Sequence, residues 1–143
     1  MFNGLAHDAD LTGLQARYCT TDHDFSGGVL VDADFGDADV SDARFVGTTL
    51  TGIDFSRATL DRADFTGDDI RGISFQGLHM ASTIFAQTMG TGVDSSRGNL
   101  SSADLSGAVL DNTSFASITA EGANFANAAL TSASFQDASL GTA

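Results

Sequence analysis

The sequence contains no proline, no tryptophan and no lysine, and Cys19 is the one cysteine among its 143 residues. A single cysteine excludes an internal disulfide framework and fits a reducing compartment. No apolar run approaches the roughly 20 residues that a membrane-spanning helix needs. The first residues also lack the basic and apolar regions of a secretory signal. We therefore expect a cytoplasmic protein that does not enter a membrane.

Positive charge is also scarce. Six arginines face 19 aspartates and glutamates, which gives a formal net charge of -13. Such a balance argues against direct binding to nucleic acid or anionic lipid, because both need a basic surface. The hydrophobic content of 42% is too high for a disordered acidic tail. The chain is expected to fold as one domain.

A five-residue repeat runs through most of the chain. From residue 25 to residue 140, every fifth position is Phe, Leu, Ile, Val or Met in 21 of 24 cases. Ten of the eleven phenylalanines occupy these positions, and alanine precedes them by two residues in eleven of the 24 blocks. Representative blocks are Ala33-Asp34-Phe35, Ala63-Asp64-Phe65, Ala103-Asp104-Leu105 and Ala123-Asn124-Phe125.

A period of five matches neither a helix of 3.6 residues per turn nor a flat strand of period two. All these side chains can face one interior only if the backbone bends once per block, which predicts a β-solenoid. Phenylalanine recurs in every second block, so a coil of four blocks stacks phenylalanine on phenylalanine and aliphatic residues on aliphatic residues. A coil of three blocks would mix them. The pattern favours four sides.

The blocks resemble the A(D/N)Lxx motif of the pentapeptide-repeat family. The resemblance covers residues 23–143 and implies an all-β fold, a right-handed quadrilateral β-helix of about six coils with four blocks in each. At a strand spacing of about 4.8 Å, the rod would be roughly 29 Å long. Residues 1–22 do not share this register. Ala9, Leu11, Leu14 and Ala16, with Asp8 as N-cap, suggest a short irregular or helical N-terminal cap over residues 1–22.

Several inward positions depart from the small-residue rule. Asp68 occupies an alanine position, and the hydroxyls of Thr48 and Thr88, one coil away on either side, are expected to donate to its carboxylate. Three large residues stack in successive coils next to the position where serine replaces phenylalanine, and they are expected to restore the missing volume. They are Ile53, Ile73 and Val93.

Residues 88–98 lose two neighbouring core side chains, although the register resumes in phase at Leu100. Two interpretations remain open for this segment: it follows the coil, or it forms an irregular loop that contacts a partner through Gly90, Asp94, Ser95 and Arg97. At the other end, the repeat continues to Leu140 without a capping segment. The sequence therefore favours a homodimer through the C-terminal coils, with Phe135 and Leu140 at the contact.

Residues for catalysis or metal binding are not grouped. His7, His23 and His79 are scattered, Cys19 lies near one histidine only, and no phosphate-binding glycine loop occurs. A filled core also leaves no evident pocket. We expect no enzyme activity, no metal and no cofactor.

The acidic residues are concentrated in residues 1–70, which hold 14 of the 19 acids and four of the six arginines. Stacking of residues one coil apart predicts three compensated groups: Arg44 between Asp24 and Asp64, Arg57 over Asp37, and Arg62 over Asp42. The carboxylates expected to stay uncompensated form the candidate partner-binding surface. They are Asp32, Asp34, Asp39, Asp54, Asp61 and Asp69.

These features favour a non-catalytic protein-binding scaffold whose partner is unidentified. The family resemblance implies a second function, because some pentapeptide-repeat proteins mimic duplex DNA and bind DNA gyrase or topoisomerase IV, which links them to quinolone resistance. An acidic rod would be steered toward a basic DNA-binding saddle. The third interpretation is a structural or regulatory repeat protein with no ligand.

Overall fold

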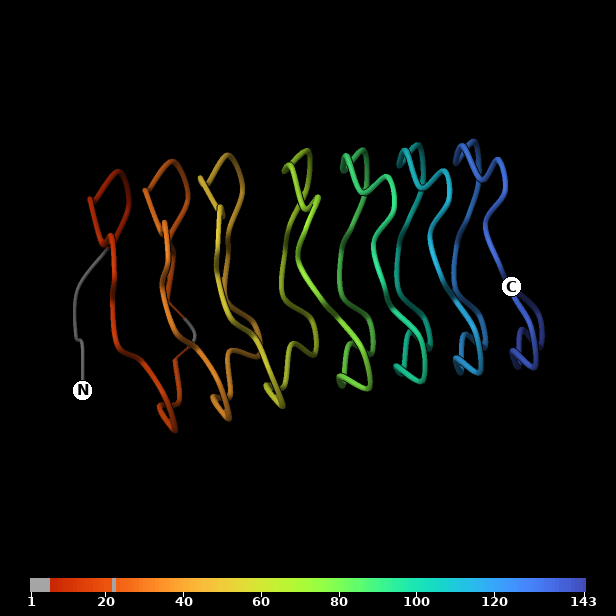
Figure 1. Cartoon of the computed structure of the whole chain (residues 1–143), viewed down its shortest axis with the longest axis horizontal. Coiled ribbons are helices and arrows are strands. Elements are labelled where there is room, and N and C mark those ends of the chain that lie inside the picture. The colour runs from red at the N-terminus through yellow and green to blue at the C-terminus, as the bar shows by residue number, and fades with distance from the viewer. Residues whose placement is uncertain (1–5, 22) are drawn as a thin grey trace.

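The structure is a computed structural model that describes residues 6–21 and 23–143. Those residues contain no helix and no extended strand, and hence no helix able to cross a membrane. Each five-residue block forms a two-residue turn and one parallel bridge. From residue 24 onward, bridges join equivalent positions of successive coils, as in Arg44 with Asp64 and Thr59 with His79. The described chain therefore winds into a rod, with its first and last coils at opposite ends (Figure 1).

The turns require a left-handed residue at their third position. In the turn that begins at Leu30, the amide of Ala33 donates to the carbonyl of Leu30 at 3.2 Å, and Asp32 has a φ of 55°. The same position has positive φ in every described turn from Asp8 to Asp137, and glycine occupies it in many blocks, for example Gly92 at 77°. A turn with positive φ only at this position is of type II, which explains why glycine is frequent there.

Two of every five side chains face the interior and form four walls. We name each wall by its first inward residue: Phe25, Leu30, Phe35 and Val40. On the Phe25 wall, the ring of Phe45 stacks between Phe25 at 5.4 Å and Phe65 at 4.7 Å between centroids. Rings of the Phe35 wall meet them edge to face, as Phe55 does with Phe45 at 5.6 Å. The predicted all-β solenoid and its stacked aromatic columns are therefore confirmed.

Residues 88–98 keep the turn-and-bridge pattern, with Met89 bridged to Val109 and Asp94 bridged to Ser114. The interpretation of this segment as an irregular loop is therefore wrong, and Gly90, Asp94, Ser95 and Arg97 lie in a regular coil. The missing volume is supplied by neighbours: Ile70 and Leu110 would lie 3.1 and 3.0 Å from a Cβ atom at Gly90. The three large residues predicted to help, Ile53, Ile73 and Val93, are all buried.

The N-terminal segment corrects the sequence-based expectation. Residues 6–21 do not form a helical or irregular cap; they continue the solenoid, with bridges from Asp10 to Val29, Gln15 to Asp34 and Thr20 to Asp39. The spacing between these partners is shorter by a single residue than in the later coils, so the register changes before Asp24. That offset hides the repeat in the sequence, because Leu11 and Ala16 fall one place out of phase. The rest of the predicted cap, residues 1–5 and 22, lies outside the described residues.

The turn geometry generates a test. Gly92 has positive φ and no atom within 4 Å of a Cβ placed on it, so the change Gly92→Ala adds backbone strain without a clash. We expect it to lower the free energy of unfolding by about 1 kcal/mol. Urea unfolding of Thr91→Ala, one residue earlier in the same turn, is the control, with an expected change within about 0.5 kcal/mol. Equal losses in the free energy of unfolding of the two variants would contradict the assignment of positive φ to Gly92.

Candidate protein-binding surface

The six carboxylates predicted as a partner-binding surface do not form one patch. Asp34 and Asp54 are bridged to each other on the outside of the Phe35 wall. Asp39 belongs to the Val40 wall and Asp69 to the Leu30 wall, where they are bridged to Thr59 and Met89. The other two, Asp32 and Asp61, lie in turns. The surface is thus spread over three walls of the rod and the turns that join them.

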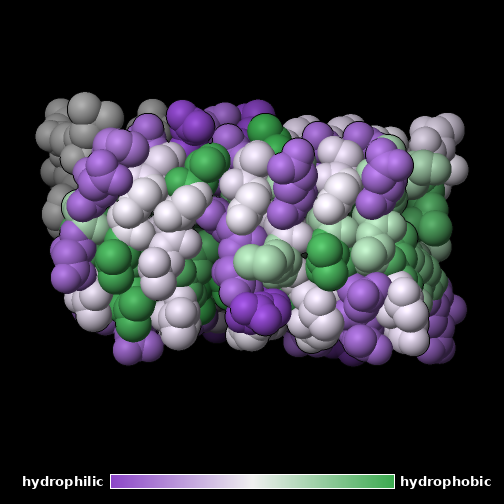
Figure 2. Space-filling model, turned by 90° about the horizontal axis from the view of Figure 1, so that it is seen from above, coloured by the Kyte–Doolittle hydropathy of each residue, from purple (hydrophilic) through white to green (hydrophobic). Residues whose placement is uncertain are grey.

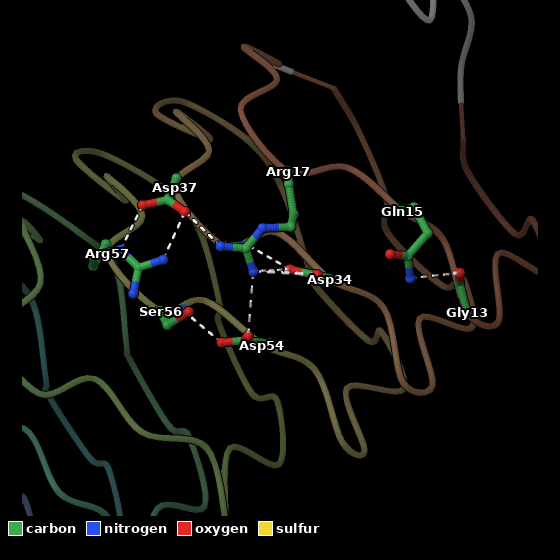
Figure 3. A network of polar contacts seen from close by, with 9 residues as sticks. Gly13, Gln15, Arg17, Asp34, Asp37, Asp54, Ser56 and Arg57 are labelled. Atoms are coloured by element: carbon green, nitrogen blue, oxygen red, sulfur yellow. Dashed lines mark hydrogen bonds and ion pairs between the residues drawn. The ribbon is translucent and has the colours of Figure 1, made fainter.

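Arg17 neutralises part of this surface. Its guanidinium lies between three carboxylates, with nitrogen–oxygen distances of 3.2 Å to Asp34, 2.5 Å to Asp37 and 4.0 Å to Asp54 (Figure 3). The prediction that Asp34 and Asp54 are uncompensated is therefore wrong. The sequence could not show this contact, because Arg17 belongs to the coil whose register is offset by one residue.

Asp69 is also paired, contrary to prediction. The Arg71 guanidinium bonds to its carboxylate at 2.5 Å, and this hydrogen bond holds the pKa of Asp69 below its ordinary value. The contact lies within one turn, between residues two apart, whereas the prediction considered only partners one coil away. Asp32, Asp39 and Asp61 have no ion pair among the described residues.

The three ion-pair groups expected from stacking are confirmed. Arg57 bonds to Asp37 at 2.6 Å and Arg62 to Asp42 at 2.7 Å, which lowers the pKa of both carboxyls. Arg44 lies between two carboxylates of adjacent coils, 4.0 Å from Asp24 and 3.7 Å from Asp64. The three arginine side chains are more than half exposed, so the pairs add little to stability and chiefly set the pattern of surface charge.

Many of the acidic side chains also shape the backbone. The carboxylate that precedes a core residue accepts a hydrogen bond from the amide two residues later, as Asp34 does from Gly36 at 2.8 Å and Asp54 from Ser56 at 2.7 Å. Such a bond stabilises the start of the next turn. Asn124 makes the same bond to Ala126 at 3.0 Å without a charge. Much of the acidic composition is therefore explained by turn formation, although the second carboxylate oxygen still faces outward.

Asp68 has a buried carboxylate, and its hydrogen-bond partners differ from those that the sequence predicted. Its Oδ1 atom accepts hydrogen bonds from the amides of Gly47 at 2.6 Å and Thr48 at 3.2 Å. The hydroxyls of Thr48 and Thr88 donate instead to the carbonyls of Phe25 and Phe85, so the predicted ladder of hydroxyls is wrong. Burial raises the pKa of Asp68 to about 7, against the effect of the two amide donors.

Features that would indicate catalysis are few in the described part of the chain. No three His, Cys, Asp or Glu side chains there come together to hold a metal ion. Cys19 is half-buried, and burial raises the pKa of its thiol, which disfavours the reactive thiolate. A surface groove of about 610 Å³ lies between two coils, lined by residues 48–52 and by Asp69, Arg71 and Gly72. It shows no group of catalytic side chains.

One surface feature was missed by the sequence reasoning. Met89 and Val109 are bridged to each other on the outside of the Leu30 wall and are 45% and 40% exposed, so they form an apolar stripe. The stripe continues to Ala129, which is bridged to Val109. Figure 2 shows apolar side chains in a row across the C-terminal half of one face. A search for apolar residues at outward positions one coil apart would have found it.

The Arg17 cluster generates the next prediction. The change Arg17→Gln leaves Asp34, Asp37 and Asp54 facing one another, so we expect a lower urea midpoint at low salt and a smaller difference at high salt. The control is Arg97→Gln, because Arg97 makes no ion pair within the described residues. Loss of stability to the same extent in both variants, or a loss that salt does not change, would contradict the proposed role of Arg17.

The chain was compared with known families and structures. Residues 38–77 match the family described as Pentapeptide repeats, in eight copies. No curated protein matches the chain in sequence. Two solved structures are similar in fold, both of trypsin-treated variants of QnrB1, a plasmid-mediated fluoroquinolone resistance protein. The match to one of them has a TM-score of 0.64 and 18% identity, and it covers 90% of this chain and 73% of the QnrB1 chain. The other has a TM-score of 0.57 and 22% identity, with coverage of 90% and 71%.

A third structure is HetL, a pentapeptide repeat protein involved in heterocyst differentiation regulation from Nostoc sp. strain PCC 7120. The match covers 95% of this chain and 90% of the HetL chain at 19% identity. Its TM-score of 0.34 is too low to establish a common fold. The family match and the observed geometry agree, since residues 38–77 form the same turns and bridges as the rest of the rod. Residues 38–77 are thus a segment of pentapeptide repeats, and the rest of the rod resembles that segment in its turns and bridges.

Proposed function

We propose that this protein is a non-catalytic scaffold that binds a protein partner through the acidic surface of its rod. The observation that carries the proposal is the contrast between the side chains inside the rod and those on its surface. Most inward positions are filled with apolar side chains, whereas many outward positions carry carboxylates held in place by turn bonds and ion pairs. We place this function in the cytoplasm, where the free thiol of Cys19 fits the reducing environment.

The charge and rigidity of the rod favour a partner with a basic surface. Carboxylates lie on three walls and in the turns of the acidic half, so this half of the rod has a negative surface. Such a surface steers a basic partner into contact. Because the turns hold the carboxylates in fixed positions, little side-chain freedom is lost on binding. The best available contacts are the three aspartates that have no ion pair among the described residues: Asp32, Asp39 and Asp61.

DNA gyrase is the second candidate partner. The specific observation in its favour is the likeness of the rod to QnrB1, a fluoroquinolone resistance protein. Some members of the family bind gyrase as DNA mimics, and the net charge of -13 suits that role. A structural or regulatory role without a ligand is the remaining alternative, and it predicts no partner that depends on the aspartates.

We also propose a homodimer through the coil formed by residues 124–143. The inward residues of this coil are only partly covered, and Leu140 is 37% exposed. The amides of Phe125, Leu130 and Phe135 donate no hydrogen bond within the described residues. An exposed apolar end with free amides is an edge that a second copy could cover by two-fold contact.

The scaffold proposal predicts binding that depends on the unpaired aspartates. The triple variant Asp32→Asn, Asp39→Asn, Asp61→Asn removes three charges from the acidic half. The matched control, Asp94→Asn, Asp104→Asn, Asp111→Asn, removes three charges from the other half. Each rod is immobilised and offered host extract and purified DNA gyrase. We expect a partner that the parent and the control retain, and that the first triple variant retains several-fold less.

The outcomes separate the candidates. Retention of gyrase, with inhibition of DNA supercoiling by the parent rod, supports the DNA-mimic function. A rod that neither binds gyrase nor inhibits supercoiling removes that function and leaves the scaffold proposal standing. If no retained protein distinguishes the first triple variant from its control, the acidic surface is not the binding surface, and the scaffold proposal is overturned.

The dimer is tested by light scattering. The parent is expected at twice the 14.7 kDa of one chain. Leu140→Arg places a charge on the exposed apolar end and should weaken association by at least about tenfold. Val109→Arg, at an exposed apolar position on the side of the rod, is the control and should remain dimeric. A parent that stays monomeric at high concentration would contradict the proposal.

A further inference from the structure

The ladder of bridges is interrupted at one junction. Thr49 is not bridged to Asp69, nor Asp54 to Ser74, although the described residues include all four. Four amides of the first coil that should cross this junction donate no hydrogen bond within the described residues: those of Leu50, Gly52, Phe55 and Arg57. Their counterparts one coil earlier all donate, at 2.8 to 2.9 Å: those of Leu30, Asp32, Phe35 and Asp37. The coils are therefore unpaired along the Leu30 and Phe35 walls.

The gap is one-sided. On the Phe25 wall, Arg44 is bridged to Asp64, and on the Val40 wall, Thr59 is bridged to His79. The aromatic columns show the same difference, because Phe45 and Phe65 on the paired side are 4.7 Å apart. Phe55 and Phe75 on the unpaired side are 6.4 Å apart. Figure 1 shows the yellow and green coils farther apart here than their neighbours.

The size of the gap limits what it can admit. Inserting another polypeptide strand would require coils about 9.6 Å apart, twice the strand spacing. The ring separation of 6.4 Å between Phe55 and Phe75 is well below that value, so the core on this side has no room for another strand. The groove lined by Thr49, Leu50, Gly52 and Asp69 is the outer mouth of this opening. A conformational role therefore fits the site better than a binding role.

Asp68 is placed where the interruption begins. In other coils, the amide at the position of Gly47 donates to a carbonyl of the next coil, as Gly27 does to Val46 at 3.0 Å and Gly67 to Ala86 at 2.9 Å. Here the Asp68 carboxylate takes the Gly47 amide instead. Its side chain also fills a position that alanine usually occupies. On the adjoining wall, Ile53 and Ile73 fill two more such positions, so three large inward side chains face this junction.

The surroundings of Asp68 leave its charge poorly compensated. Its Oδ2 atom is buried and has no hydrogen-bond partner among the described residues. On its own coil, Asp64 repels it and Asp69 is paired with Arg71. The preceding coil contributes Gly47 and Thr48, which are uncharged, and Arg44, which is occupied by Asp24 and Asp64. The following coil contributes Thr88 and Met89, which carry no charge.

We propose that the junction between residues 48–57 and 68–77 is a hinge in the rod, and that the protonation state of Asp68 controls its opening. With Asp68 neutral, the two coils close on the unpaired side. When Asp68 ionises, its buried charge draws water into the gap, and the coils part while the Phe25 and Val40 walls stay bridged. The two halves of the rod then change their relative angle.

The sign of the pH effect follows from the buried carboxyl. The pKa of Asp68 is about 7 in the folded chain, above the ordinary value of an aspartate. The folded chain therefore holds a proton that the unfolded chain releases at lower pH. The stabilisation from neutral Asp68 is complete below about pH 4 and is lost as the pH rises through about 7.

Amide hydrogen exchange measured by NMR tests the hinge, with rates corrected for the intrinsic effect of pH. We expect Leu50 and Gly52 to exchange at least about tenfold faster than Leu30 and Asp32. The ratio should rise between about pH 5.5 and about pH 8, as Asp68 ionises. In Asp68→Asn, which keeps the acceptor for the Gly47 amide without the charge, the ratio should not change with pH. In Asp68→Ala it should fall several-fold at both pH values.

Asp39→Asn is the matched control, because it removes an exposed charge that is not among the groups acting on Asp68 and should keep the pH dependence of the parent. The parent alone can overturn the proposal, so the test does not depend on folding of the variants. Equal protection of Leu50 and Leu30 at both pH values would exclude a hinge. A pH-dependent ratio that persists in Asp68→Asn would show that another group controls the opening.

Discussion

The narrow interior of the solenoid is the constraint on which the rest of the structure depends. Two side chains from each block must fit inside a coil of four blocks, so one position takes a large apolar residue and the other a small one. Where this allocation changes, neighbours compensate: Ile118 is large where Ala120 is small, and Ile70 and Leu110 close over Gly90. Interiors are packed densely, so such local exchange is required for a continuous core.

The filled interior moves all functional possibilities to the outside. There the aspartates serve two purposes, because the same side chain bonds to the following turn and presents a charge. Arginines neutralise the densest groups, as Arg17 does for Asp34, Asp37 and Asp54. The net charge of the chain is therefore a poor measure of the surface offered to a partner. The carboxylates without an ion pair in the described part of the chain, such as Asp39 and Asp61, are the more informative features.

Asp68 shows what happens when the packing rule is broken by a charge. A carboxylate in a small inward position replaces a backbone acceptor and leaves two walls unpaired at one junction. Elsewhere, the buried threonines satisfy their hydroxyls on backbone carbonyls, as Thr83 does on Leu60 at 2.7 Å, without loss of pairing. The difference is physical: a hydroxyl can donate to a carbonyl, whereas a carboxylate must compete with it for an amide.

The sequence alone determined the solenoid, its aromatic columns and the stacked pairs such as Arg57 with Asp37, because each follows from a repeat of five and a coil of four blocks. It also marked Asp68 as exceptional. Only the tertiary structure showed that residues 6–21 form a coil and that Arg17 contacts three carboxylates. A shift of one residue removes the signal of the repeat while leaving the turns intact. The partners of Asp68 and the gap beside it were likewise decided by the tertiary structure. A carboxylate and a carbonyl compete there for one amide, and the outcome depends on the separation of two coils. The period of the repeat does not determine that separation.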